Sequence, residues 1–227
     1  AAAPGALWAL RRSDLPPAEA AQGHDEELGG QTGHPAVVPG AVGVPAAPPT
    51  EADRHVAAPL QPLGAGRIVI VVIAHDRPFL LRRCLDAILE QAELEFFALA
   101  VTLDAPAHFD AMEPAVKERS TAERPIKVWR KEKTGSSLAV QKIAEHFQFA
   151  LQQSFDVHHY DFALLVENDL LPSPDFLWYF RHAGGVLEAD PSLFCVSAWN
   201  DNGFSELVSD ERRLFRTDYF PGLGWMI

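Results

Sequence analysis

The sequence has 227 residues and a formal net charge of −12, with 31 Asp and Glu residues against 19 Lys and Arg residues. This acidic balance argues against a nucleic-acid backbone or an anionic membrane surface as the main partner. The chain is long enough for one sizeable hydrophobic core, and nowhere do eighteen apolar residues follow one another, so the sequence contains no candidate membrane span.

Residues 1–66 differ in composition from the rest of the chain. They hold ten of the 18 prolines and nine of the 15 glycines on an Ala-rich background, and they show no sustained hydrophobic period. This composition predicts a disordered stem or linker, so we expect the folded domain at residues 67–227. Because the first residue is not Met and no leader pattern is present, we expect any targeting signal to lie outside this sequence.

Continuous apolar runs at residues 68–74 and 162–166 are typical of strands that are buried on both faces of a sheet. Two further strands are predicted at residues 97–103 and 126–129. After Pro78, apolar residues recur at helical spacing and predict a helix with one buried face, which comprises Leu81, Cys84, Leu85, Ile88 and Leu89. Cys84 and Cys195 allow at most one internal bridge, and this low count assigns no redox compartment.

A second helix is predicted at residues 136–153, with an apolar face comprising Val140, Ile143, Ala144, Phe147 and Leu151. A third helix is expected to begin at Ser173-Pro174, a capping pair, and to end near residue 188. Residues 193–198 and 214–220 are predicted strands, and residues 221–225 a tight glycine loop. The alternation of strand and helix predicts an α/β domain with a mostly parallel sheet flanked by helices.

Charged side chains follow three of the predicted strands: Asp76 and Arg77 follow the first, Asp104 the second, and Glu167 and Asp169 the central one. The carboxyl ends of parallel strands meet at one edge of the sheet, where open α/β sheets bind ligands. Carboxylates at such an edge suit Mg²⁺ or Mn²⁺ shared with substrate phosphates. The alternative is that the acids after residue 166 are only turn residues.

Several other sites are excluded by the sequence. No glycine-rich fingerprint follows the first strand, where H-D-R-P-F-L replaces G-x-G-x-x-G, so NAD or FAD binding is not expected. There is no phosphate-binding P-loop, no G-x-S-x-G motif and no Cys/His spacing for zinc. Arg77 offers a planar fork for a phosphate or ribose group. His146 lies near the edge of its helical face, where a histidine is more often packed or solvated than a ligand contact.

Five segments make the sequence similar to a known family: I-A-H-D-R-P, K-I-A-E-H-F-Q-F-A-L, V-E-N-D-L-L-P-S-P-D-F, F-C-V-S-A-W-N-D-N-G and F-R-T-D-Y-F-P-G-L-G-W-M. In order and spacing they resemble the amino-terminal, nucleotide-sugar half of the N-acetylglucosaminyltransferase I family. The resemblance implies a GT-A fold, incomplete on its C-terminal side. It also implies an inverting, metal-dependent transfer of GlcNAc from UDP-GlcNAc in β-1,2 linkage to the α-1,3-linked mannose of a high-mannose N-glycan on a glycoprotein. A type II Golgi membrane protein is implied, with the domain on the lumenal side and the anchor upstream.

The resemblance also implies roles for the residues after the central strand. Asp169 would be the sole protein ligand to Mn²⁺, which would bridge the diphosphate. Glu167 would bind the GlcNAc hydroxyls, and Asn168 would lie near the ribose. The family motif is usually E-D-D, so Asn168 replaces an acid, and we expect binding to be retained with altered affinity because an amide can still form hydrogen bonds.

Four more residues would form the nucleotide wall by resemblance. Asp104 would accept from uracil N3–H, His146 would lie beside the uracil, and Ile73 and Arg77 would complete the wall. Cys195 resembles a cysteine whose partner lies further downstream, so both cysteines of this chain are expected to be unpaired.

The general base that inversion requires is expected beyond Ile227, so the catalytic residue is not assigned. Asp201 and Asp218 are interpreted as a turn residue and a strand-end residue. Two alternative functions remain open. One is the related protein O-mannose β-1,2-N-acetylglucosaminyltransferase family, and the other is a non-catalytic module that binds a nucleotide sugar.

Overall fold

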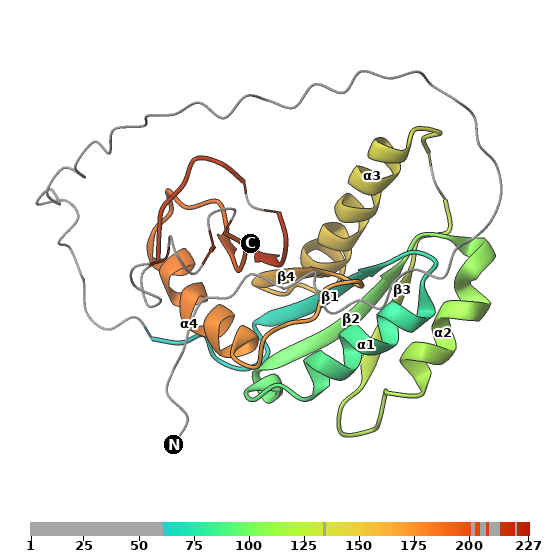
Figure 1. Ribbon diagram of the computed structural model, residues 1–227, viewed down its shortest axis with the longest axis horizontal. Coiled ribbons are helices and arrows are strands. Elements are labelled where there is room, and N and C mark those ends of the chain that lie inside the picture. Colours follow the sequence, from blue (N-terminus) through green and yellow to red (C-terminus); the bar gives the residue numbers. More distant parts are fainter. Residues whose placement is uncertain (1–60, 134, 201–202, 205–207, 209–213, 221) are drawn as a thin grey trace, which may run out of the picture. The chain divides into compact units, whose positions relative to one another are not determined.

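The computed structural model describes residues 61–133, 135–200, 203–204, 208, 214–220 and 222–227 (Figure 1). The predicted stem therefore lies almost wholly outside the described residues, as does Asp201. The described residues form a six-stranded sheet in the order β3-β2-β1-β4-β6-β5. The strands are β1 (Ile68–Ala74), β2 (Phe97–Leu103), β3 (Ile126–Arg130), β4 (Phe162–Glu167), β5 (Val196–Ser197) and β6 (Trp225–Met226).

The first four strands pair in parallel, and β6 runs antiparallel to both β4 and β5. The helices are α1 (Pro78–Leu89), α2 (Phe109–Lys117), α3 (Ala139–Gln152) and α4 (Phe176–Ala189). Short helical turns add η3 (Leu94–Phe96), η4 (Pro106–His108) and the π-helical η5 (Gln153–Val157). The predicted α/β class, a mostly parallel sheet flanked by helices, is confirmed.

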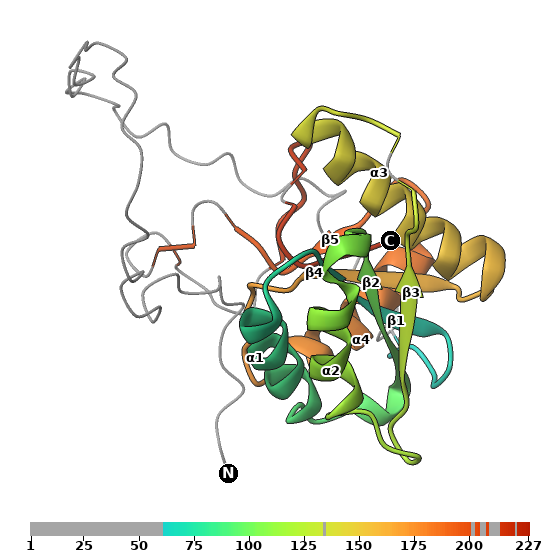
Figure 2. The same ribbon diagram turned by 90° about the vertical axis from the view of Figure 1, so that its right-hand side faces the viewer.

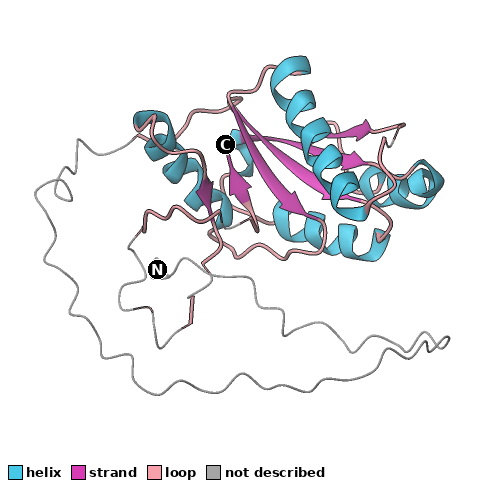
Figure 3. Cartoon of the chain, turned by 90° about the horizontal axis from the view of Figure 1, so that it is seen from above, coloured by secondary structure: helices cyan, strands magenta, loops and turns pink. Residues whose placement is uncertain are grey.

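Helices cover both faces of this sheet (Figure 3). The helices α1, α2 and α4 pack on the face that includes Ile70 and Val72 of β1, where α1 and α2 lie side by side (Figures 1 and 2). The helix α3 and η5 pack on the opposite face, which includes Val69 and Val71. Alternate residues of β1 thus enter two different cores, which is why the strand is apolar throughout.

The buried face of α3 differs from the prediction. Val140 and Ile143 are 79% and 59% exposed, whereas His146 is 4% exposed and Ala150 is fully buried. Figure 1 shows the reason, because the first turns of α3 rise away from the sheet and only its second half lies against the strands. The apolar period of this helix located the helix correctly, but it did not show which part of it contacts the sheet.

The C-terminal strands also differ from the prediction. Residues 214–220 form no strand, and the described large apolar side chains in this stretch are exposed. Instead Trp225 and Met226 form β6, and both side chains are buried. Gly224, at φ 67°, turns the chain into this strand in a conformation that glycine adopts without strain. Of the strand predicted at residues 193–198, Val196–Ser197 alone pairs.

Two boundaries shift by a few residues. Leu63, upstream of the predicted start of the domain, is buried against α4, where its backbone exchanges hydrogen bonds with Arg181. The helix α4 begins at Phe176 rather than Pro174, because Pro174 lies in a turn and the Ser173 carbonyl accepts from the Phe176 N–H at 3.0 Å. Both cysteines are free, as predicted. Among the described residues, no helix has the length and apolar character needed to cross a membrane.

Candidate functional site

Three residues form one row across the carboxyl ends of β2, β1 and β4. Thr102 pairs with Ile73, and Ile73 pairs with Glu167. All three occupy the alternate positions that face α3, as do Val71 and Leu165 two residues earlier. Because neighbouring strands are about 4.8 Å apart, the row extends roughly 10 Å across the sheet. A ligand that binds at this edge on the α3 side would lie along the row.

An acidic corner lies at the β4 end of the row. The Leu170 N–H donates to the Glu167 carbonyl at 3.1 Å and closes a turn directly after the strand. This turn places Asp169 Oδ2 3.2 Å from Nη2 of Arg77, which follows β1. The structure thus confirms that these two strand ends bring their charged side chains together. Both side chains remain accessible to a ligand, since neither is buried.

Asn168 lies beneath this corner. Its backbone N–H donates to the Ile73 carbonyl at 3.0 Å and continues the pairing of β4 with β1. The side chain is buried, and its amide donates to the Arg77 carbonyl at 3.5 Å. The structure therefore shows Asn168 joining the two loops of the corner, and its predicted position near a ribose stays a prediction.

Glu167 is half-buried, and this burial raises the pKa of its carboxyl group. The neighbouring Asp169 charge raises the pKa further, and Arg77 opposes the increase. Both causes disfavour the ionised form. A bound sugar hydroxyl or cation at this corner would offset part of that cost by interacting with the carboxylate.

The other end of the row carries a cluster of polar side chains around Asp104. His75 Nδ1 lies 2.6 Å from Asp104 Oδ1, and His146 Nδ1 lies 3.4 Å from Asp104 Oδ2. His146 Nε2 lies 2.8 Å from the hydroxyl of Thr102, so the cluster joins β1, β2 and α3. The structure thus brings together Asp104 and His146, which are 42 residues apart in the sequence.

The protonation of His146 follows from its surroundings. Burial lowers the pKa of its imidazole to about 4, and the attraction of Asp104 offsets only part of the effect, so the ring is neutral at pH 7. A neutral imidazole carries one N–H, and a carboxylate can only accept. We therefore assign the proton to Nδ1, which faces Asp104, and in this tautomer Nε2 accepts the hydroxyl hydrogen of Thr102.

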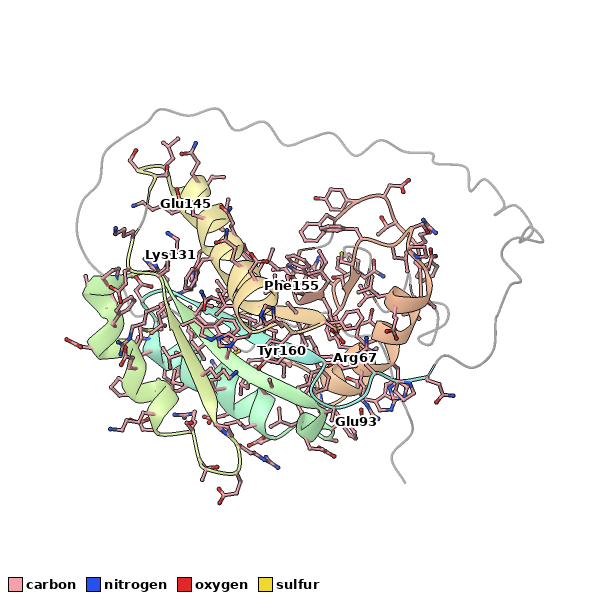
Figure 4. All side chains as sticks on the ribbon, turned by 180° about the vertical axis from the view of Figure 1, so that it is seen from behind. Arg67, Glu93, Lys131, Glu145, Phe155 and Tyr160 are labelled. Atoms are coloured by element: carbon pink, nitrogen blue, oxygen red, sulfur yellow. The ribbon has the colours of Figure 1, made fainter. Side chains whose placement is uncertain are left out.

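The loop after β3 is tied to α3 beside this cluster. The Lys131 N–H donates to the Leu103 carbonyl at 2.7 Å, and Lys131 Nζ lies 3.3 Å from Glu145 Oε2 (Figure 4). Glu145 also accepts from the Gly135 N–H at 2.9 Å. These contacts hold α3, and with it His146, against the strand ends.

The acidic corner fits a divalent cation only as a shared site. Among the residues that the structure describes, no group of three or more His, Cys, Asp or Glu side chains could hold a metal ion. Mg²⁺ and Mn²⁺ commonly bind through one or two carboxylates and complete their coordination with substrate phosphates and water. Asp169 is an accessible carboxylate of this kind, and its present partner, Arg77, would have to share or release it.

Sequence reasoning missed His75 and Thr102 as members of this site. His75 directly follows the strand predicted at residues 68–74, and Thr102 lies within the strand predicted at residues 97–103, so neither residue carries a signal of its own in the sequence. The register supplies the missing signal, because Ala74 pairs with Leu103, so the next residues in both strands, His75 and Asp104, are neighbours. Asp218 lies at a bend in an exposed segment, and the structure brings it to no described member of the site.

A comparison with protein families identifies the relationship. The GNT-I family model matches residues 48–227, which is most of the chain. The chain belongs to the GNT-I family. The match begins upstream of the predicted domain start and includes all the site residues described above.

Comparisons with individual proteins cover less of the chain. An Arabidopsis thaliana protein named alpha-1,3-mannosyl-glycoprotein 2-beta-N-acetylglucosaminyltransferase is 41% identical over 96 residues, which are 42% of this chain and 22% of that protein. Among solved structures, the mannosyltransferase PcManGT from Pyrobaculum calidifontis, in complex with GDP-Man and Mn²⁺, has a TM-score of 0.45 at 21% identity, over 63% of this chain and 37% of its own. S. aureus TarS has a TM-score of 0.37 at 16% identity, over 54% of this chain and 20% of its own. TM-scores below 0.5 do not establish a shared fold.

Proposed function

We propose that this GNT-I family chain is the donor-binding, GT-A part of an inverting N-acetylglucosaminyltransferase. Its donor is UDP-GlcNAc, and its acceptor is the α-1,3-linked mannose of a high-mannose N-glycan, to which GlcNAc is added in β-1,2 linkage. The observation that carries the proposal is the row Thr102–Ile73–Glu167, with Asp104 at one end and Asp169 at the other. Family membership and the name of the plant relative support the same reaction.

In this proposal the two ends of the row bind different parts of the donor. Asp104 and neutral His146 bind the uracil, and Ile73 forms the floor between them and the acidic corner. Arg77 provides a planar cation for the diphosphate, and Glu167 accepts from the GlcNAc hydroxyls. The charges agree with this orientation of the donor, since the negative phosphates would lie beside the positive guanidinium group of Arg77.

Asp169 is the proposed ligand for Mn²⁺. A divalent cation there would neutralise charge on the departing UDP. The acceptor hydroxyl must also lose a proton to a general base, and we propose that this base lies beyond Ile227. Lumenal Golgi localisation with an upstream membrane anchor is part of the proposal, and only the family resemblance supports it.

Calorimetry with UDP-GlcNAc tests the donor site in this chain. We expect binding that requires Mn²⁺ and is lost in Asp169→Asn. Asp76→Asn is the matched control, because Asp76 is an exposed carboxylate at the same strand edge, 4.0 Å from Arg77. Binding of equal strength without metal, or equal losses in the two variants, would refute the assignment of Asp169.

Acceptor choice is tested separately in the full-length protein, which would include the proposed general base, by transfer of labelled GlcNAc to a Man5 N-glycan and to an O-mannosyl peptide. Transfer to the N-glycan supports the proposed reaction. Transfer to the peptide alone would indicate the O-mannose enzyme. Donor binding without transfer to either acceptor would indicate a nucleotide-sugar binding module.

A further inference from the structure

His75 makes the shortest contact that the structure gives Asp104. Its Nδ1 lies 2.6 Å from Asp104 Oδ1, whereas His146 Nδ1 lies 3.4 Å from the other oxygen. The two side chains differ in exposure, since that of His75 is 57% exposed and that of Asp104 only 10%. A solvent-accessible histidine thus holds a nearly buried carboxylate at the edge of the sheet.

The direction of this hydrogen bond follows from chemistry. An ionised carboxylate can only accept, so His75 Nδ1 donates to Oδ1. The terminal torsion of aspartate is broad, so the plane of a carboxylate is set by its partners rather than by its own rotamer. With His75 on one oxygen and His146 facing the other, the plane of Asp104 is fixed. Each oxygen keeps a second lone pair for another donor.

We propose that His75 is a positioning residue that orients the Asp104 carboxylate to accept an imide N–H from the nucleobase, and thereby favours uracil over cytosine. Uracil presents a donor at N3, whereas cytosine presents a lone pair that would face the carboxylate. This preference for uracil depends on a fixed carboxylate. If the Asp104 carboxylate could rotate, it would turn away from the N3 lone pair of cytosine, and the repulsion that disfavours cytosine would be smaller. This inference rests on the proposed function, in which Asp104 faces the base.

The test compares binding of UDP and CDP by calorimetry, with Mn²⁺ present, in the 227-residue chain. His75→Ala removes the donor, and we expect roughly tenfold weaker UDP binding and a smaller preference for UDP over CDP, as for loss of one charge-assisted hydrogen bond. His75→Asn should restore both, because the asparagine amide lies close to the position of imidazole Nδ1 and also donates. His108→Ala is the control, since its ring lies 6.1 Å from that of His75 and the structure shows no bond from it to Asp104.

Asp104→Ala separates the two proposals. If it removes the UDP preference while His75→Ala leaves that preference unchanged, the positioning role is overturned and the donor site stands. If Asp104→Ala itself leaves the preference unchanged, the assignment of the uracil site fails. Equal losses in His75→Ala and His75→Asn would also overturn the positioning role, because the donated hydrogen bond would not be what matters.

A spectroscopic measurement tests the contact without any ligand. In ¹⁵N-labelled protein, His75 should carry its proton on Nδ1 at a pH where the ring is neutral, and Asp104→Asn should change that nitrogen's chemical shift. A neutral His75 with its proton on Nε2 would overturn the proposal.

Discussion

Thr102→Val removes a buried hydrogen-bond donor with almost no change in side-chain shape. Thr102 is fully buried, and its hydroxyl lies 2.8 Å from Nε2 of His146, which is itself 4% exposed. The valine variant leaves that nitrogen without a donor and without access to water. An unsatisfied buried polar group costs about 1–3 kcal/mol, so we expect the free energy of unfolding to fall by about 2 kcal/mol. For a domain of this size the melting temperature should fall by roughly 4–8 °C.

Urea unfolding, monitored by circular dichroism and tryptophan fluorescence, measures this change as a lower midpoint at an unchanged m-value. A double-mutant cycle with His146→Leu isolates the hydrogen bond. In the leucine background the His146 nitrogen is absent, so Thr102→Val cannot leave it unsatisfied. We expect Thr102→Val to be neutral or stabilising there, because leucine deprives the buried Thr102 hydroxyl of its partner nitrogen. An equal cost in both backgrounds would refute the reasoning and trace the loss to packing around the new methyl group.

Three further predictions concern other parts of the domain. The raised pKa of Glu167 means that the folded protein holds this proton more tightly than the unfolded chain, so stability falls as pH rises from about 4.5 through the folded pKa. Glu167→Gln should therefore unfold at a higher temperature than wild type at pH 7, with the difference vanishing below pH 4; no difference at pH 7 would contradict this. Burial raises the pKa of the Cys84 thiol to about 12, so at pH 8 a thiol reagent should modify only Cys195 in the folded protein, and rapid modification of two thiols would show that Cys84 is accessible. Ile143→Gln should change the free energy of unfolding by at most about 0.5 kcal/mol, because the side chain is 59% exposed; a loss of about 2 kcal/mol or more would mean that the first half of α3 is covered.

The parallel part of the sheet was predictable because its signals are local. The run I-V-I-V-V-I-A predicts a strand at residues 68–74, and the structure has β1 with the same bounds. Residues 97–103 likewise match β2. These strands are buried on both faces, so nearly every residue in them is apolar, and a polar residue directly follows each strand, His75 after β1 and Asp104 after β2.

The errors arose where structure depends on distant partners. The buried face predicted for α3 is the one expected of a helix that packs on the sheet along its whole length. The first half of this helix instead extends beyond the sheet. Residues 214–220 contain the residue types of a strand but form none, whereas Trp225 and Met226 pair with β4. Neither outcome is encoded in the period of the segment itself.

The sequence predicted those members of the candidate site that directly follow a predictable strand. Arg77 and Asp169 were expected at one edge, and the structure places them 3.2 Å apart. The contact of His75 with Asp104 was not expected, because it depends on the register of two strands rather than on either sequence alone. Register is a property of the pair, so side chains that meet through it are found only when the pairing is known.

The pairing of β6 with β4 has a consequence for the order in which the domain forms. Ala163 and Ile227 exchange two backbone hydrogen bonds, at 2.9 and 3.1 Å, across a long stretch of intervening chain. During synthesis β1, β2, β3 and β4 are complete well before residues 225–227 leave the ribosome, so the apolar strand Phe162–Glu167 waits with one edge open. An open apolar edge is a template for pairing with other chains. Nascent chains of this domain should therefore depend on chaperones until β6 has been synthesised.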